Sequence, residues 1–148
     1  MSGRITKSLV HALDATARLF GLGSGEAAHI NTGRRGEEAA YFHLRKLGYT
    51  MVARNWRSPR LAGELDLVGW DDSVLCIIEV KTRGSRHLLP AEIAVDAAKQ
   101  DELIAVGREF LRRLPDRTPS RADVVSVYCR PDGEPEEITL FKNAFPLR

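Results

Sequence analysis

The sequence predicts a mixed α/β domain, in which helices pack against one β-sheet. Two segments have the apolar spacing of amphipathic helices and five have the composition of strands. They follow one another in the order α-β-β-β-α-β-β, which indicates a mixed sheet with helices against it. The chain has 148 residues, of which 43% are hydrophobic and 28% charged, values that suit a globular protein with one core.

Residues 1–30 are predicted to form a flexible N-terminal arm, and residues 31–148 the α/β domain. The arm has helical character near Ile5–Phe20 and then the glycine- and serine-rich stretch Gly21–Gly25, which is typical of a linker. We therefore expect the arm to contain one helix and to move independently of the domain.

The first domain helix is expected to begin at Asn31 or Thr32, since either side chain can cap a helix, and to run to about Leu47. Gly48 follows, and glycine is the residue that helices most often have just after their end. Glu37 lies on the same stripe as the apolar residues of this helix, where a carboxylate needs a partner. The apolar residues of that stripe are Ala40, Leu44 and Leu47.

The remaining elements are predicted from alternation, turn residues and caps. A second helix over about 97–114 would be capped by Asp96. The strand that begins at Val74 is apolar at both odd and even positions, so we expect it to be central and covered on both faces. The five predicted strands are Tyr49–Trp56, Glu64–Trp70, Val74–Thr82, Val124–Cys129 and Glu136–Phe141.

Two pairs of charged residues stand out on neighbouring predicted strands. Glu64 and Asp66 are two residues apart on one strand, and Glu79 and Lys81 on the next, so each pair shares a face. A two-residue loop at Asp71-Asp72 would pair Gly69 with Val74 and place Glu64 opposite Glu79. In this register all four charged side chains lie on one face of the sheet, with opposite positions about 5 Å apart.

Three carboxylates at that spacing repel one another, and a divalent cation resolves the repulsion. Mg²⁺ prefers oxygen ligands and keeps positions for water and phosphate, and a neighbouring lysine can orient the attacking water and stabilise negative charge. The pattern therefore favours a catalytic site that holds Mg²⁺ or Mn²⁺. The alternative is a set of charges at the strand ends in which Lys81 pairs with Glu79 or Asp66.

The net charge is only +2, so the chain as a whole does not announce a nucleic-acid partner. Residues 33–60, however, hold seven Arg and Lys against two Glu, and a second group of arginines follows later. These groups are either solvated faces or a surface that binds phosphates. The second group consists of Arg108, Arg112, Arg113, Arg117 and Arg121.

Composition also bears on the cellular setting. No apolar run approaches the roughly 18 residues of a membrane span, so no membrane partner is expected. Cys76 and Cys129 are too few for a disulfide framework, which favours reduced, structural thiols in a cytoplasmic protein.

An ordered series of motifs over about residues 31–147 resembles the YraN-like family, a bacterial group assigned to the PD-(D/E)XK nuclease superfamily. The matching strings are Gly36-Glu37, Gly63-Glu64-Leu-Asp66-Leu-Val68, Glu79-Val-Lys81-Thr82-Arg83, Pro90-Ala-Glu92, Lys99-Gln100, Arg121-Ala-Asp123-Val-Val125 and Asn143-Ala-Phe145.

The resemblance implies the restriction-endonuclease-like fold and assigns roles to individual residues. Asp66 and Glu79 match the metal-binding acids of the superfamily, and Lys81 matches its catalytic lysine. Glu37 matches a helical acid that some members direct at the metal. Glu64 belongs to the family string, as a second-layer residue or an alternate ligand. Gln100 either reaches the site or caps a backbone group.

Two functions remain open at this point. The first is a Mg²⁺- or Mn²⁺-dependent endonuclease that cuts DNA rather than RNA, in branched or single-stranded form. The second is a non-catalytic module that binds nucleic acid or a protein and retains only the fold. Resolvase-like nucleases act as pairs, so a homodimer is compatible with the resemblance. In the nuclease, basic side chains would hold the DNA backbone without reading its sequence, namely Arg34, Arg35, Arg54, Arg57 and Arg83.

Overall fold

A computed structural model of the chain describes residues 24–84 and 95–147. Its elements follow the predicted order α-β-β-β-α-β-β, which confirms the mixed α/β class. The helices in the described residues are α2 (Ser24–Lys46) and α3 (Ala97–Leu111). The strands are β1 (Thr50–Arg57), β2 (Glu64–Asp71), β3 (Val74–Arg83), β4 (Ser120–Cys129) and β5 (Pro135–Phe145).

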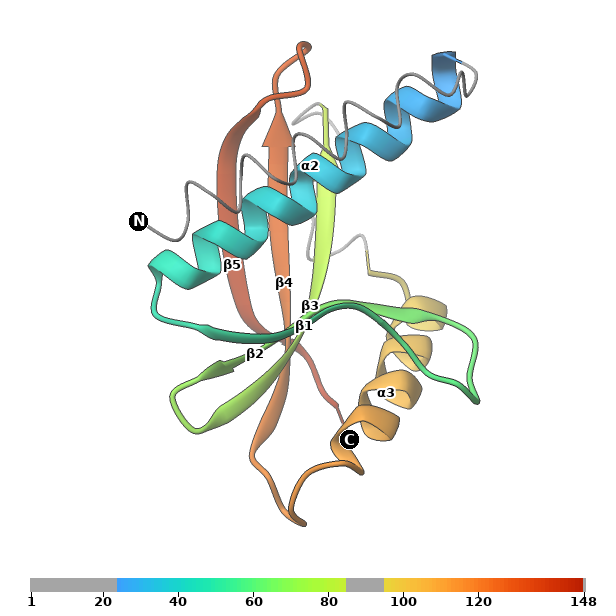
Figure 1. Cartoon of the computed structure of the whole chain (residues 1–148), viewed down its shortest axis with the longest axis vertical. Coiled ribbons are helices and arrows are strands. Elements are labelled where there is room, and N and C mark those ends of the chain that lie inside the picture. The colour runs from blue at the N-terminus through green and yellow to red at the C-terminus, as the bar shows by residue number, and fades with distance from the viewer. Residues whose placement is uncertain (1–23, 85–94, 148) are drawn as a thin grey trace.

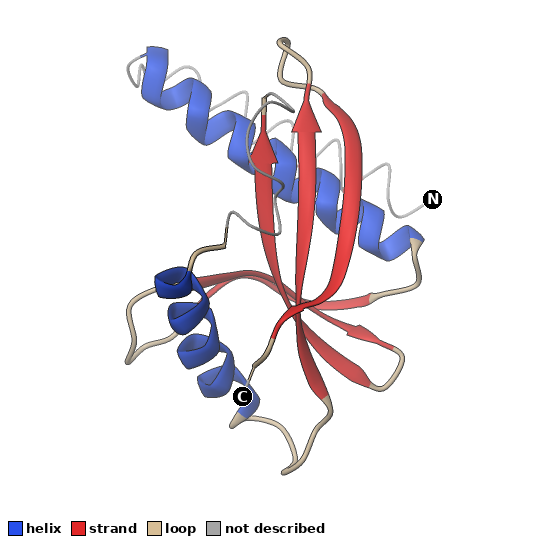
Figure 2. Cartoon of the chain, turned by 180° about the vertical axis from the view of Figure 1, so that it is seen from behind, coloured by secondary structure: helices blue, strands red, loops and turns tan. Residues whose placement is uncertain are grey.

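The five strands form one sheet in the order β1-β2-β3-β4-β5. Only the β3–β4 pair is parallel, and α3 lies in the connection between those two strands, as a parallel crossover requires. Helices α2 and α3 lie on opposite faces of the sheet, as the two views from front and back show (Figures 1 and 2). This is the restriction-endonuclease-like arrangement that the motif series implied.

The sheet separates two hydrophobic cores, one under each helix. Under α3, Leu103 and Val106 pack with Leu75 and Ile77 of β3. Under α2, residues such as Ala40 and Leu44 pack with Cys76 and Ile78 of the same strand. Residues 75–80 of β3 are all buried, so the prediction of a central strand covered on both faces is confirmed.

The start of the first domain helix was predicted wrongly. Helix α2 begins at Ser24 rather than at Asn31 or Thr32, so it includes the end of the expected linker Gly21–Gly25. The sequence Glu26-Ala27-Ala28 has high helix propensity and extends the helix past the possible caps. The helix expected near Ile5–Phe20 lies outside the described residues.

The end of α2 was predicted correctly, and the structure shows how it stops. Gly48 has a φ of 97°, in the left-handed region that glycine adopts readily. The amides of Gly48 and Tyr49 donate to the carbonyls of Arg45 and Leu44, at 3.1 and 3.0 Å, which is the pattern of a Schellman motif. Leu47 was expected on the inward stripe but is 53% exposed, because the chain turns away from the core at this point.

The β2–β3 register differs from the predicted one by two residues. The loop is Asp72-Ser73 rather than Asp71-Asp72, so Asp71 pairs with Val74 and Gly69 with Cys76. Since side chains alternate with a period of two, this shift leaves the same residues on each face. Continued outward, the observed register places Asp66 rather than Glu64 opposite Glu79.

A buried ionic network holds the turn end of this hairpin to the rest of the sheet. Arg121 of β4 lies 2.6 Å from Oδ2 of Asp71, and its Nε donates to Asp123, whose side chain is fully buried. Lys142 of β5 also contacts Asp71, at 2.7 Å, and Arg121 donates to the hydroxyl of Tyr49. The strands β2, β4 and β5 are thereby tied together at one end.

Candidate active site

The predicted acidic residues lie at the other end of the hairpin, where β2 and β3 separate. The antiparallel ladder runs from Asp71–Val74 as far as Leu67–Ile78. Beyond it, the backbone amide of Val80 donates to Oδ2 of Asp66 at 2.8 Å. The carboxylate of Asp66 thus takes the place of a backbone carbonyl as the acceptor for Val80. Because the two strands separate here, further side chains can enter between them.

Asp66 and Glu79 form a pair of buried carboxyl groups at this opening. Their exposed fractions are 9% and 5%, respectively. Burial raises the pKa of Asp66 to about 8, and repulsion from the Glu79 carboxylate adds to this effect. Two acids that disfavour each other's ionisation in this way carry an excess of negative charge only when both are ionised, and a bound cation would stabilise that state.

Lys81 neutralises part of this charge. Its Nζ lies 3.2 Å from Oε1 of Glu79, two residues earlier on the same face of β3. The other oxygen of Glu79, Oε2, is buried and has no hydrogen-bond partner among the described residues. An unpartnered buried carboxylate oxygen carries a desolvation cost, so this atom is available to a further ligand.

Glu37 of α2 lies within electrostatic range of the buried pair. It is half-buried, and burial raises its pKa, while Arg54 and a hydrogen bond from Asn55 oppose the rise. The carboxylates of Glu64 and Glu79 raise the pKa further, which places Glu37 within electrostatic range of both. Gly36 permits this approach, since a Cβ at that position would overlap the side chain of Thr82.

Asn55 is a residue of the site that the sequence analysis missed. It lies in β1 between the pairs Arg54–Leu67 and Trp56–Leu65, with a φ of 47°, and it hydrogen-bonds Glu37. The signal was an asparagine inside a strand, where this residue is disfavoured but where it adopts left-handed backbone more easily than most.

Glu64 lies at the rim and is ion-paired outside the buried pair. Its Oε2 is 2.9 Å from the guanidinium of Arg57, which is itself exposed. This contact is compatible with a second-layer role for Glu64. The carboxylate of Glu64 also raises the pKa of Glu37, so Glu64 interacts with the other acids of the site.

Two neighbouring residues at the start of α3 differ in what they contact. The side-chain amide of Gln100 donates to the carbonyl of Val95 at 2.9 Å, which is the backbone-capping alternative. Lys99, which was not among the predicted site residues, interacts electrostatically with Asp66 and Glu79. The string Lys99-Gln100 is part of the motif series, but the proximity of Lys99 to the acids depends on how α3 packs across the sheet.

The arginines proposed for the DNA backbone are placed differently from one another. Arg34 and Arg54 are exposed, and Arg54 lies over the ring of Tyr41 at 5.1 Å. Arg35 is ion-paired with Glu134 at 3.3 Å, so it joins α2 to the β4–β5 turn. Arg83 has a buried Nε without a hydrogen-bond partner in the described part of the chain.

A cavity of about 510 Å³ adjoins the site between the β1–β2 loop and the start of α3. Glu64 and Lys99 line it, together with Arg57, Ser58, Leu61, Ala62, Gly63 and Glu102. Asp66 and Glu79 lie beside this cavity rather than in its wall. Because Glu64 belongs to its wall, the cavity offers space for a ligand beside the acidic residues.

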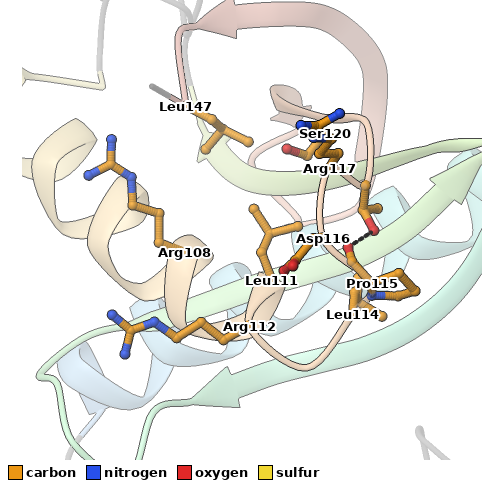
Figure 3. A pocket seen from close by; sticks show the side chains of 10 residues that line it. Arg108, Leu111, Arg112, Leu114, Pro115, Asp116, Arg117, Ser120 and Leu147 are labelled. Atoms are coloured by element: carbon orange, nitrogen blue, oxygen red, sulfur yellow. Dashed lines mark hydrogen bonds between the residues drawn. The ribbon is translucent and has the colours of Figure 1, made fainter.

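A second cavity, of about 340 Å³, lies at the far end of α3 (Figure 3). Arg108 and Arg112 are on one side and Arg117 on the other, around apolar residues such as Leu111 and Leu147. Cations at the C-terminal end of a helix also stabilise the helix itself, which accounts for two of these arginines. The second basic group is therefore divided, since Arg121 belongs to the network with Asp71.

In the parts of the chain described here, no group of three carboxylate, histidine or cysteine side chains is arranged to hold a metal ion. The arrangement is instead a buried pair, with Glu37 farther away. Mg²⁺ usually takes only one or two protein carboxylates and completes its shell with water and phosphate. The pair and the unpartnered Oε2 of Glu79 fit such a cation.

The chain is similar to a group of bacterial proteins. The model of the uncharacterised protein family UPF0102 matches residues 36–127. A UPF0102 protein of Koribacter versatilis is 52% identical over 122 residues, which is 82% of this chain and 84% of that protein. UPF0102 proteins of Porphyromonas gingivalis and Symbiobacterium thermophilum are 42% and 44% identical, over 82% and 76% of this chain and 88% and 94% of theirs.

Proposed function

The chain belongs to UPF0102, the uncharacterised YraN family, and from this premise we propose that it is a metal-dependent nuclease that hydrolyses phosphodiester bonds in DNA. One observation carries the proposal. Asp66 and Glu79 are buried side by side next to Lys81, and an oxygen of Glu79 is left without a partner. A protein that needed only stability would gain by replacing such a pair with apolar residues.

We propose that Asp66 and Glu79 hold Mg²⁺ or Mn²⁺, and that Glu37 faces the bound cation from α2. When bound, such a cation supplies Lewis-acid polarisation of the phosphate and makes hydroxide available from water near neutral pH. The helix and the two strands contribute rigidity, since each acid is fixed by its element and by contacts such as that of Val80 with Asp66.

Lys81 has the positioning and electrostatic role in this proposal. Its side chain is 24% exposed, so Lys81 extends from Glu79 towards the surface where a phosphate would arrive. There it would orient the attacking water by hydrogen bonding and stabilise the charge that develops on the phosphate oxygens. The water loses a proton as its oxygen bonds to phosphorus, the bridging P–O bond breaks, and the leaving oxygen gains a proton to give a hydroxyl end.

Basic residues near the opening would hold the backbone of the DNA. Arg54 and Arg57 lie on β1 beside Glu37 and Glu64, where they can approach both the site and solvent. Contacts of this kind fix the position of a duplex or a single strand without selecting its sequence. In residues 24–84 and 95–147, no helix is long and apolar enough to span a bilayer.

The proposal is tested by cleavage of branched, single-stranded and duplex DNA with Mg²⁺ or Mn²⁺. We expect cleavage that depends on the metal and that falls at least about 100-fold in Asp66→Asn and in Lys81→Gln, because each variant removes a charged group at the reacting phosphate. Asp72→Asn and Lys46→Gln are matched controls that remove the same charges at exposed positions, and both should retain activity. Metal-dependent cleavage that survives Asp66→Asn would count against the site.

A second candidate is a binding module with an inactive site. The observation that favours it is the direct contact of Lys81 with Glu79, which satisfies both charges without a metal. Titration calorimetry with Mn²⁺, in the presence and absence of DNA, separates the two functions. Absence of metal binding in both conditions would select the binding module.

A further inference from the structure

Lys99 occupies a position where a lysine is unfavourable for the helix that carries it. Asp96 is the N-cap of α3, and its Oδ1 accepts from the amide of Lys99 at 2.8 Å, so Lys99 is the third residue of the first turn. A helix N-terminus carries partial positive charge and favours acids, and the third position is where capping boxes have Glu or Gln. The first turn of α3 has no acidic residue.

The surroundings of Lys99 explain why it is tolerated there. Its Nζ lies 2.7 Å from Oε1 of Glu102, one turn later on α3. Burial alone would lower the pKa of Lys99, but Glu102, Glu79 and Asp66 more than offset this and raise it, so the side chain is a cation. It thus faces the buried acids from a different element than Lys81 does.

The cavity beside Lys99 depends on a close approach between the β1–β2 loop and α3. Gly63 has a φ of 105°, and a Cβ there would lie 2.7 Å from side-chain atoms of Glu102. The approach leaves a cavity of about 510 Å³ with Lys99 and Arg57 as its cations. Each cation is matched by a carboxylate of the same cavity, since Arg57 pairs with Glu64 and Lys99 with Glu102.

We infer that Lys99 binds a backbone phosphate of the substrate strand, next to the scissile phosphate, in the cavity between the β1–β2 loop and α3. The inference rests on the proposed function. A cation held by Asp66 and Glu79 would neutralise the negative charge of the site, which Lys99 otherwise faces. Lys99 then remains available to an incoming anion, so metal and DNA bind with positive coupling. In the opposing arrangement, Lys99 serves only as a counter-charge for the acids.

The two arrangements agree on the effect of Lys99→Gln on Mn²⁺ affinity and differ on its effect on DNA affinity. In both, Lys99→Gln leaves Mn²⁺ affinity unchanged or tighter, because a cation near the acids has been removed. Only a phosphate ligand predicts weaker DNA binding. We expect the Kd of a single-stranded oligonucleotide with Mn²⁺ to rise about tenfold, as for loss of one charged contact, and the slope of log Kd against log salt to fall by about 0.7.

The measurement uses the full chain in a Lys81→Gln background, so that DNA is bound and not cut. The double variant Lys99→Gln/Glu102→Gln keeps the local charge and should still bind DNA more weakly. Glu102→Gln alone should bind DNA more tightly, since Lys99 then has no competing partner. Lys99→Arg should restore most of the affinity, and Lys46→Gln controls for loss of a distant surface charge.

Equal Kd and equal salt slope in the Lys81→Gln parent and its Lys99→Gln derivative would overturn the inference and leave the proposed function intact. A parent that binds Mn²⁺ but no DNA, or neither, would overturn both. Retained Mn²⁺ affinity in each variant shows that the site has folded, so weaker DNA binding cannot then be attributed to unfolding.

Discussion

Asp66 has an environment that suits a ligand of a cation better than a structural residue. It accepts one backbone hydrogen bond, from Val80, and faces the carboxyl group of Glu79 with little access to water. Burial and this neighbour raise the pKa of Asp66 to about 8. Without a metal, the acid is therefore protonated at neutral pH, and a cation must displace that proton.

This pKa makes the stability of the metal-free protein depend on pH. Between about pH 4 and pH 8 the folded state binds a proton at Asp66 that the unfolded state releases. The contribution of protonated Asp66 to the free energy of unfolding is therefore fully present below about pH 4, and it is lost as the pH rises through about 8. Asp66→Asn mimics the neutral acid, so urea unfolding in EDTA should show the variant more stable than the unaltered protein at pH 8–9, with a flatter pH profile.

Two further measurements complete this test. Asp72→Asn, at an exposed turn position, should show the pH profile of the unaltered protein. Saturating Mn²⁺ at pH 8 should stabilise the unaltered protein and not Asp66→Asn, because only the folded state with both acids binds it. Parallel pH profiles for the unaltered protein and Asp66→Asn would contradict the assignment.

At the scale of single residues, sequence reasoning found those whose type and spacing are unusual by themselves. Asp66, Glu79 and Lys81 were predicted from two strings on neighbouring strands, and the structure brings the three side chains together. Lys99 was missed because its neighbours come from another element. Asn55 was missed because its effect depends on a left-handed backbone that the sequence only hints at.

At the scale of elements, tertiary contacts decide what local patterns leave open. The alternation of β2 and β3 fixed which residues share a face, but two registers satisfied it equally well. The carboxylate of Asp71 is held by Arg121 and Lys142, and Asp72 rather than Asp71 adopts left-handed backbone. Contacts with β4 and β5, which are remote in sequence, therefore favour the observed β2–β3 register.

The packing of α2 on β3 gives a prediction with an internal control. Gly36→Ala adds a Cβ that overlaps Thr82, whereas the Cβ of Gly33→Ala, on the same helix, meets no atom of the described residues within 4 Å. Gly33→Ala should stabilise the protein by about 0.5–1 kcal/mol through helix propensity. Gly36→Ala should destabilise it by roughly 1–3 kcal/mol despite the same gain, because α2 must move off β3. Urea unfolding measures both, and equal stabilisation by the two substitutions would refute the close contact.

At the scale of the whole molecule, the fold explains why the acids meet. Helices on both faces bury the central strand β3, and the site forms where β2 leaves it. The order of elements and the central strand were predictable because periodicity and apolar runs report burial directly. The start of α2 was not, since Asn31 and Thr32 are competent caps and only the preceding Glu26-Ala27-Ala28 extends the helix through them.

The most direct test of the proposed metal site is the position of Mn²⁺ in crystals of the full chain, located by its anomalous scattering at pH 8 or above. We expect a peak within coordination distance, roughly 2.0–2.5 Å, of carboxylate oxygens of both Asp66 and Glu79. The peak should be absent from crystals of Asp66→Asn grown in the same way. Mn²⁺ bound elsewhere on the protein, with Glu79 still in contact with Lys81, would contradict a metal site at Asp66 and Glu79.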